Sequence, residues 1–281
     1  MRKVLVNGVS LHYQQYGAGS DVILVHGLTS NLSFWVLHTV PRLMEHHRIT
    51  VYDLRGHGFS GRPSTGYTSA HLADELHGLM DALGIARAHV VGHSYGGTIA
   101  LHHALRYPER VNSIVVADSA ITALRTYQSF GEWPLLEDVK QALGEYGVTL
   151  PENDDLFNLR TLLPQLKKVP VDQRLMAGRP RRRARMGALV ATTTVLEEFD
   201  EVGELTEDRI CSITSPTLAL FGEHSPFRGT ALFLQERLPR CRAIMLPGGG
   251  HLIPAQAAGQ FSQAVREHCA TVEAEAAVAG W

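Results

Sequence analysis

The chain has 281 residues, 44% of them hydrophobic, and a formal net charge of -2 at pH 7 with histidine counted as neutral. This length and apolar content suit a single globular α/β sheet with an insertion. The nearly neutral charge excludes a global field for nucleic acid or an anionic membrane, so such binding would need a local patch.

The three cysteines are widely separated and form no CxxC pair. They argue against a disulfide framework or a zinc site, and a reducing compartment fits them best. The N-terminus runs almost at once into strand-like sequence, without the apolar segment of a signal peptide. No apolar run reaches the roughly 18 residues of a membrane span. We therefore expect a cytoplasmic protein.

Short apolar runs of strand length alternate with helical patterns along most of the chain. The runs are continuous instead of alternating with polar residues, which indicates an α/β fold with a mostly parallel central sheet flanked by helices. The predicted strands are residues 3–6, 9–16, 21–26, 48–53, 88–93, 111–118, 216–221 and 241–246. The predicted helices are residues 33–45, 69–83, 95–107, 229–238 and 255–269, and residues 272–281 are interpreted as a fraying helix or tail.

Residues 121–206 interrupt this alternation. They are helical in pattern and carry no convincing strand. We interpret them as an inserted helical cap on a core formed by residues 1–120 and 207–281. Ligands of such sheets bind at the carboxyl ends of the strands.

The sequence GHSYG, from Gly92 to Gly96, follows a predicted strand and precedes a predicted helix. A serine on such a tight turn needs small neighbours on both sides. The turn lifts the Ser94 hydroxyl above the sheet and places the free N–H groups of the helix N-terminus where an oxyanion would develop. This context favours Ser94 as a nucleophile over a plain structural turn.

The strand 21–26 ends in His26 and Gly27. Here the glycine lets the chain turn across the strand ends, so that the next N–H faces the serine. The backbone N–H groups of Leu28 and Tyr95 are the predicted oxyanion hole. A histidine at a strand end commonly braces a loop, and we prefer this role for His26 over that of a base or metal ligand.

Four motifs together resemble the α/β-hydrolase fold superfamily: HG at 26–27, DLRGHGFSGRP at 53–63, GHSYGG at 92–97 and GGGHLIP at 248–254. The resemblance covers nearly the whole chain outside the predicted cap. It implies Ser94 as the nucleophile and His251 as the general base, and a histidine in a Gly-rich loop after the last strand can indeed reach such a serine. It implies no cofactor. The other histidines show no metal-ligand spacing, and we predict no metal.

Within the second motif, Asp53 ends a strand but precedes the nucleophile in sequence. His57 lies in RGHG, a loop turn typical of the superfamily. We expect both side chains to hold this loop and to take no part in chemistry.

The base needs a carboxylate on its other side. In most members of the superfamily this is an Asp on a GxxD pattern after the strand corresponding to 216–221, but here GEHS places Ser225 at that position. Asp118 ends the preceding strand, and some relatives look similar in carrying their acid there. We predict Asp118 as the acid. The alternative is that Asp118 caps the first turn of the cap and Glu223 reaches His251.

The predicted cap carries a local run of positive charge, Arg179, Arg181, Arg182, Arg183 and Arg185, called the arginine run below. One interpretation is a solvated turn and helix start. The other is a dock for an acidic carrier protein or a carboxylated substrate, because guanidinium groups grip carboxylate and phosphate well. Nucleic acid is disfavoured, since no aromatic or Gly-rich platform accompanies the run.

Aromatic residues of the predicted cap can roof an apolar pocket, and they are equally explained as the core of the cap. These residues are Tyr127, Phe130, Trp133 and Phe157.

We interpret the chain as a serine hydrolase of a small-molecule carboxylic ester or lactone with an apolar body. The motifs do not specify the substrate, because one fold serves many chemistries. A thioesterase or cyclase that unloads an acyl carrier is the closest rival, and the arginine run would discriminate it. A C–C bond hydrolase would use the same residues. A hydrolase-like binding protein without catalysis is the alternative from another class.

Overall fold

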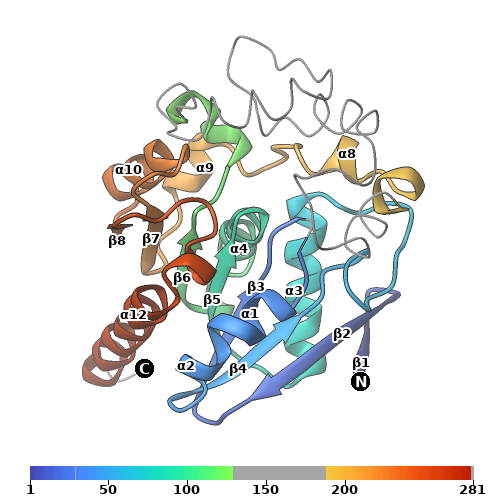
Figure 1. Cartoon of the computed structure of the whole chain (residues 1–281), viewed down its shortest axis with the longest axis horizontal. Helices are drawn as coiled ribbons and strands as arrows, with labels where there is room; N and C mark the ends of the chain where they lie inside the picture. The colour runs from blue at the N-terminus through green and yellow to red at the C-terminus, as the bar shows by residue number, and fades with distance from the viewer. Residues whose placement is uncertain (29, 129–187, 280–281) are drawn as a thin grey trace.

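The structure is a computed structural model that describes residues 1–28, 30–128 and 188–279. Its centre is an eight-stranded sheet in the order β1-β2-β4-β3-β5-β6-β7-β8 (Figure 1). The pairs β1–β2 and β2–β4 are antiparallel, and the remaining pairs are parallel. The strands are β1 (Arg2–Val6), β2 (Val9–Tyr16), β3 (Ser20–Val25), β4 (His47–Tyr52), β5 (Ala88–His93), β6 (Val111–Ala117), β7 (Thr217–Gly222) and β8 (Cys241–Leu246).

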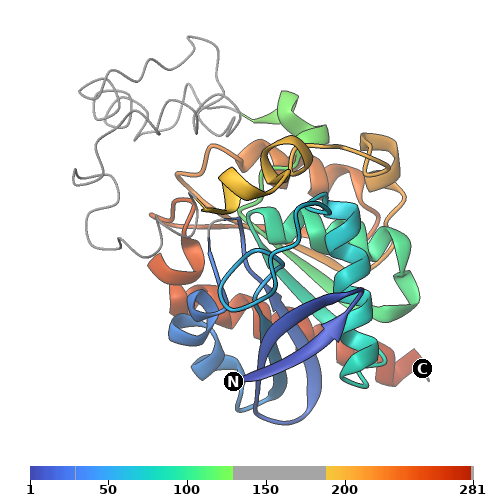
Figure 2. The same cartoon turned by 90° about the vertical axis from the view of Figure 1, so that its right-hand side faces the viewer.

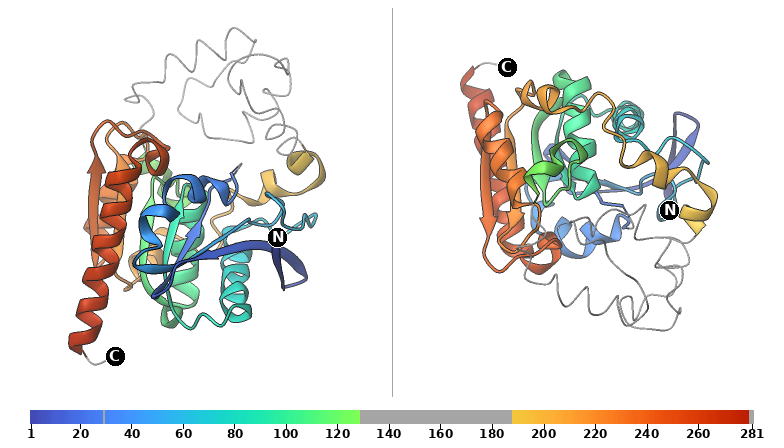
Figure 3. Two further views of the ribbon diagram at one scale, coloured as in Figure 1. Left: turned by 60° about the horizontal axis from the view of Figure 1, so that its bottom comes forward. Right: turned by 90° about the horizontal axis from the view of Figure 1, so that it is seen from above.

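Helices cover both faces of the sheet (Figure 3). Successive side chains of β3 point to opposite faces: Val22 and Leu24 belong to one core, Ile23 and Val25 to the other. The first core is shared with α1 (Ser33–His38), α2 (Val40–Leu43) and α12 (Ala258–Ala279), and the second with α3 (Ser69–Ala82), α4 (Tyr95–Arg106), α9 (Glu207–Cys211) and α10 (Arg228–Arg237). This two-faced burial explains the continuous apolar runs, and it confirms the predicted mostly parallel sheet flanked by helices.

Two predicted helices differ from the structure. The predicted helix 33–45 is divided at Thr39 into α1 and α2, and Pro41 lies in the first turn of α2, where its missing N–H breaks no helical bond. The predicted helix 255–269 is divided at Ala257 into α11 (Ile253–Gln256) and α12. Helix α12 continues through Ala279, so the Ala-rich residues 272–279, interpreted as a fraying helix or tail, are helical. Within the described ranges no helix, α12 included, combines the length and the apolar character needed to cross a bilayer.

Short helices flank residues 129–187, which lie outside the described residues. They are η2 (Thr122–Tyr127) before this stretch and α8 (Val195–Glu198) after it, at the same end of the molecule as α9 (Figures 1 and 2). Asp200 accepts hydrogen bonds from Thr122 and Arg125, which ties the two flanks together. The boundaries 121–206 of the predicted cap stay a prediction.

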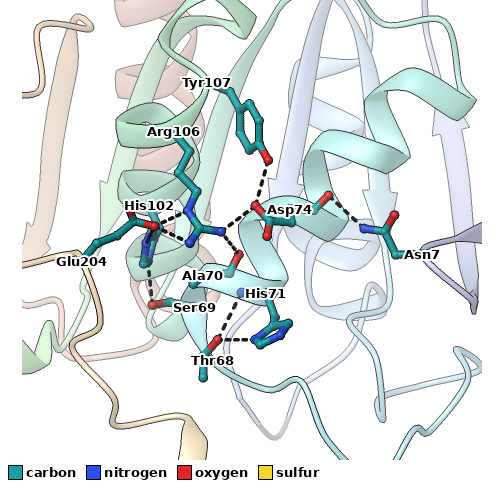
Figure 4. A network of polar contacts seen from close by, with 10 residues as sticks. All are labelled: Asn7, Thr68, Ser69, Ala70, His71, Asp74, His102, Arg106, Tyr107 and Glu204. Carbon is teal, nitrogen blue, oxygen red and sulfur yellow. Dashed lines mark hydrogen bonds and ion pairs between the residues drawn. The ribbon is translucent and has the colours of Figure 1, made fainter.

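A polar network fastens the segment after α8 to the core (Figure 4). The Glu204 carboxylate forms an ion pair with Arg106 of α4 and lies 3.4 Å from Nε2 of His102. Arg106 also forms an ion pair with Asp74 of α3 at 2.6 Å, and Nδ1 of His102 lies 3.0 Å from the Ser69 hydroxyl. The network therefore fixes where the chain re-enters the core.

Candidate active site

Ser94 lies on a strained turn between β5 and α4. Its backbone has φ 55° and ψ -124°, in the positive-φ region that L residues rarely adopt. The flanking glycines are required by packing, because a Cβ on Gly92 would lie 2.0 Å from the carbonyl oxygen of Gly96, and a Cβ on Gly96 would lie 2.2 Å from that of Val25. The local backbone therefore has the form that the nucleophile prediction requires.

The loop after β3 passes directly against this serine. A Cβ added to Gly27 would lie 2.8 Å from the Cβ of Ser94 and 3.3 Å from its Oγ. Leu28 follows at once, and Tyr95 is the first residue of α4, where an N–H has no acceptor within the helix. Both residues of the predicted oxyanion hole are thus next to Ser94 or Gly27 in the chain, and their role stays a prediction.

The structure brings Asp118 and His251 together. Nδ1 of His251 lies 2.9 Å from Oδ1 of Asp118, whose side chain is fully buried at the end of β6. Glu223 is exposed, and its Oε2 accepts a hydrogen bond of 2.9 Å from the Gly248 N–H. Of the two acids considered from the sequence, Asp118 is therefore the one in contact with the histidine.

Ser225, which stands where an Asp was expected, contacts the same carboxylate. Its hydroxyl donates to Oδ1 of Asp118 at 2.7 Å, and the Gly222 N–H donates to Oδ2 at 2.8 Å. In the sequence, position 225 stands out only as the place of a missing acid, so the contact of Ser225 with Asp118 is a finding of the structure. The sequence carries no signal for this contact, because a serine after a strand end has no pattern that specifies an acceptor on the neighbouring strand.

His93 supports the loop that carries His251. Its Nε2–H donates to the His251 carbonyl oxygen at 2.7 Å, and the two ring centroids are 4.9 Å apart. Burial lowers the pKa of His93 to about 3, and the neighbouring His251 adds to this lowering. A neutral ring in this position is a fixed brace, which the sequence analysis did not identify.

Two further histidines brace loops, as predicted. Nδ1–H of His26 donates to the Gly27 carbonyl oxygen at 2.8 Å, and its Nε2 accepts from the Leu54 N–H at 3.1 Å. Nδ1–H of His57 donates to the Arg55 carbonyl oxygen at 2.8 Å. Burial lowers the pKa of both, that of His57 to about 3. Both rings are therefore neutral hydrogen-bonding groups.

Asp53 is a loop anchor, also as predicted. Its carboxylate accepts hydrogen bonds from the Leu32 N–H at 2.8 Å and the Phe59 N–H at 2.9 Å, and it pairs with Nδ1 of His12 at 2.7 Å. These contacts occupy both carboxylate oxygens and hold the loops after β3 and β4 in place.

Two apolar residues of the predicted cap, Leu189 and Val195, pack with Tyr67 of the core near Leu28. Tyr67, Leu189 and Val195 form a small buried cluster against which Leu28 packs. Tyr127, by contrast, donates to Glu207 through its hydroxyl at 3.1 Å and places its ring on α10. The sequence analysis did not identify the cluster, because Leu189 and Val195 are far from Leu28 in sequence.

Several sequence predictions lie outside the described residues. Phe130, Trp133, Phe157 and the arginine run belong to residues 129–187. In the described part of the chain, no three His, Cys, Asp or Glu side chains are arranged to hold a metal ion.

Comparison with known proteins places these features in context. A family model described as alpha/beta hydrolase fold matches residues 22–258. RutD of Pantoea ananatis, named as a putative carbamate hydrolase, is 44% identical over 104 residues, and the match spans 37% of this chain but only 38% of that protein. The 2-(acetamidomethylene)succinate hydrolase of Mesorhizobium japonicum is 29% identical over 262 residues, covering 90% of this chain and 88% of that protein.

A solved structure is also similar to this chain over most of its length. The meta-cleavage product hydrolase CumD of Pseudomonas fluorescens has a TM-score of 0.65 and 26% sequence identity to this chain. The alignment covers 95% of this chain and 97% of that one. The similarity therefore extends over nearly all of both chains.

Proposed function

This chain belongs to the alpha/beta hydrolase fold family, and from that premise we propose that it is a serine hydrolase with Ser94 as its nucleophile. The observation that carries the proposal is the 2.9 Å contact between His251 and the buried Asp118. A histidine held by a carboxylate, together with a serine on a strained turn, is the constellation that acyl transfer requires.

In the proposed mechanism the Oγ of Ser94 attacks the substrate carbonyl while His251 takes its proton. Asp118 accepts the Nδ1–H of His251, which selects the tautomer with a free Nε2 and stabilises the imidazolium. The N–H groups of Leu28 and Tyr95 hold the developing oxyanion. His251 then returns the proton to the leaving alcohol, and water hydrolyses the acyl-enzyme.

For the substrate we propose a carboxylic ester or lactone with an apolar body. Support comes from the cluster of Tyr67, Leu189 and Val195, because Leu28 packs against it and carries one of the proposed oxyanion donors. The three cluster residues are themselves buried, whereas Leu28 is only partly buried, so an apolar acyl or ring group packed on the Leu28 side chain would have its carbonyl near Ser94. Burial of such a group contributes to binding roughly in proportion to its area.

A C–C bond hydrolase is the second candidate. It is favoured by the similarity to the meta-cleavage product hydrolase CumD, which extends over nearly the whole chain. The same serine, histidine and carboxylate would serve this reaction. The relatives named for a carbamate and for 2-(acetamidomethylene)succinate add these two compounds to the substrates worth testing.

A substrate panel tests the proposal. The purified chain and its Ser94→Ala variant are assayed on p-nitrophenyl esters of increasing chain length, on lactones, on acyl thioesters, on a carbamate and on a dienoate of the meta-cleavage type. We expect the highest kcat/KM on an apolar ester or lactone, and a loss of about 10³-fold or more in Ser94→Ala. Retention of more than about a tenth of the activity would rule out Ser94 as the nucleophile.

A further inference from the structure

The end of β7 and the loop after it donate hydrogen bonds to the carboxylate of Asp118, which follows the neighbouring strand β6. Strands β6 and β7 are adjacent and parallel in the sheet (Figure 1). Asp118 directly follows β6, and its N–H donates to the Leu220 carbonyl oxygen of β7 at 3.1 Å. The backbone of Asp118 has φ 45°, an uncommon conformation for a non-glycine residue. Two donors then bind its two oxygens: the N–H of Gly222, the last residue of β7, and the hydroxyl of Ser225 in the loop that follows.

The hydroxyl of Ser225 has a fixed direction. Its oxygen accepts a hydrogen bond of 3.0 Å from the Phe227 N–H, and its own proton points at Oδ1 of Asp118, 2.7 Å away. The side chain is 3% exposed, which limits competition from water. A buried hydroxyl that is both acceptor and donor holds the carboxylate in one rotamer.

Ser225 and His251 meet at the same atom. Oδ1 of Asp118 accepts from the Ser225 hydroxyl at 2.7 Å and from Nδ1 of His251 at 2.9 Å. The ring of Phe227, two residues after Ser225, packs edge-on against His251 with centroids 5.4 Å apart. The loop that supplies Ser225 therefore contacts both the acid and the base.

We propose that Ser225 is the positioning residue of the catalytic acid, an inference that rests on the function proposed above. It aligns Oδ1 of Asp118 with His251, and a carboxylate placed at position 225 serves His251 when Asp118 is neutralised. A purely structural serine that only accepts from the Phe227 N–H would affect stability without this second property.

The first part of the test removes and restores the hydroxyl. Ser225→Ala lowers kcat by about tenfold, because a hydrogen bond to a charged acceptor is lost, while KM changes little. Ser225→Thr keeps the hydroxyl and stays within about threefold of the wild type. Thermal unfolding of each variant shows that the fold is retained.

The second part moves the charge. Asp118→Asn loses most of the activity, and the double variant Asp118→Asn with Ser225→Asp regains about tenfold or more over it, because the carboxylate returns next to His251. The matched control is Asp118→Asn with Ser225→Asn, which has the same shape without the charge and gains nothing. This comparison reads out charge near the base and is insensitive to packing.

Two results together would overturn the inference. The first is a kcat of Ser225→Ala within about twofold of the wild type. The second is a double variant carrying Ser225→Asp that is no more active than the control carrying Ser225→Asn. Failure of the proposed function gives a different result, since Ser94→Ala would then remain active. The two failures are therefore separated by the Ser94→Ala control measured beside the series.

Discussion

Burial of His103 makes the fold sensitive to acid in a way that a single substitution can relieve. His103 lies on α4 with no exposed surface, and among the described residues neither ring nitrogen has a hydrogen-bond partner. Burial lowers the pKa of His103 to about 3, and the charges of His77 and Arg110 add to this lowering. The ring is therefore held neutral in the folded state.

The direction of the effect follows from proton binding. The ordinary pKa of histidine, 6.5, applies in the unfolded chain, so below that pH the unfolded state binds a proton that folded His103 does not. The favourable contribution to the free energy of unfolding is complete above about pH 7 and is lost as the pH falls from about 6.5 to about 3. At about pH 5 the loss amounts to about 2 kcal/mol.

His103→Leu removes this titration and breaks no hydrogen bond, since the ring makes none among the described residues. We measure the free energy of unfolding by urea denaturation at about pH 8 and pH 5, for the wild type and for His103→Leu. Both proteins lose stability between these pH values, and we expect the loss in His103→Leu to be smaller by about 2 kcal/mol. An equal loss in the wild type and His103→Leu would refute the reasoning.

Three further predictions concern the site. Asp118→Asn should lower kcat by about 10³ to 10⁴-fold and Glu223→Gln by less than about tenfold, and the reverse ranking would assign the acid to Glu223. Gly27→Ala should lower kcat/KM by at least about tenfold, because the new Cβ would lie 2.8 Å from the Cβ of Ser94. The control is Gly259→Ala, whose new Cβ would meet no neighbouring atom within 4 Å, and which should match the wild type. If the arginine run docks an acidic carrier, replacing its three central arginines with alanine should slow turnover of carrier-bound thioesters, most at low salt, and spare small esters; an equal effect on both would exclude the dock.

The sheet was predictable because its strands are buried on both faces. A strand that is buried on both faces needs apolar residues at successive positions, and runs such as 111–118 and 216–221 show this pattern. The strands begin and end within a residue or two of the predicted bounds. Because the ends of these strands could be predicted, the residues that stand at the carboxyl ends of the strands could be predicted as well. Asp118 could be placed near His251 because it ends a strand at the carboxyl edge of the sheet, where ligands bind, and because some superfamily members carry their acid after that strand.

Side-chain direction was not predictable from the same patterns. Ser225 and His93 donate hydrogen bonds to Asp118 and His251, which are far away in sequence, and nothing in the neighbourhood of either donor specifies that acceptor. The cluster around Leu28 joins residues that only the folded chain brings together, such as Tyr67 and Leu189. For residues 272–281 the sequence left a fraying helix and a tail open, because the stretch is Ala-rich without a strong amphipathic pattern, and the structure continues α12 through Ala279.

The proposed nucleophile is tested most directly by covalent labelling with a fluorophosphonate, followed by intact mass and peptide mapping. Only a serine activated by a base reacts rapidly with such a probe. We predict one adduct per chain, located on Ser94, and none in Ser94→Ala. An unlabelled wild-type chain, or an adduct that persists in Ser94→Ala, would contradict the account and favour a hydrolase-like binding protein.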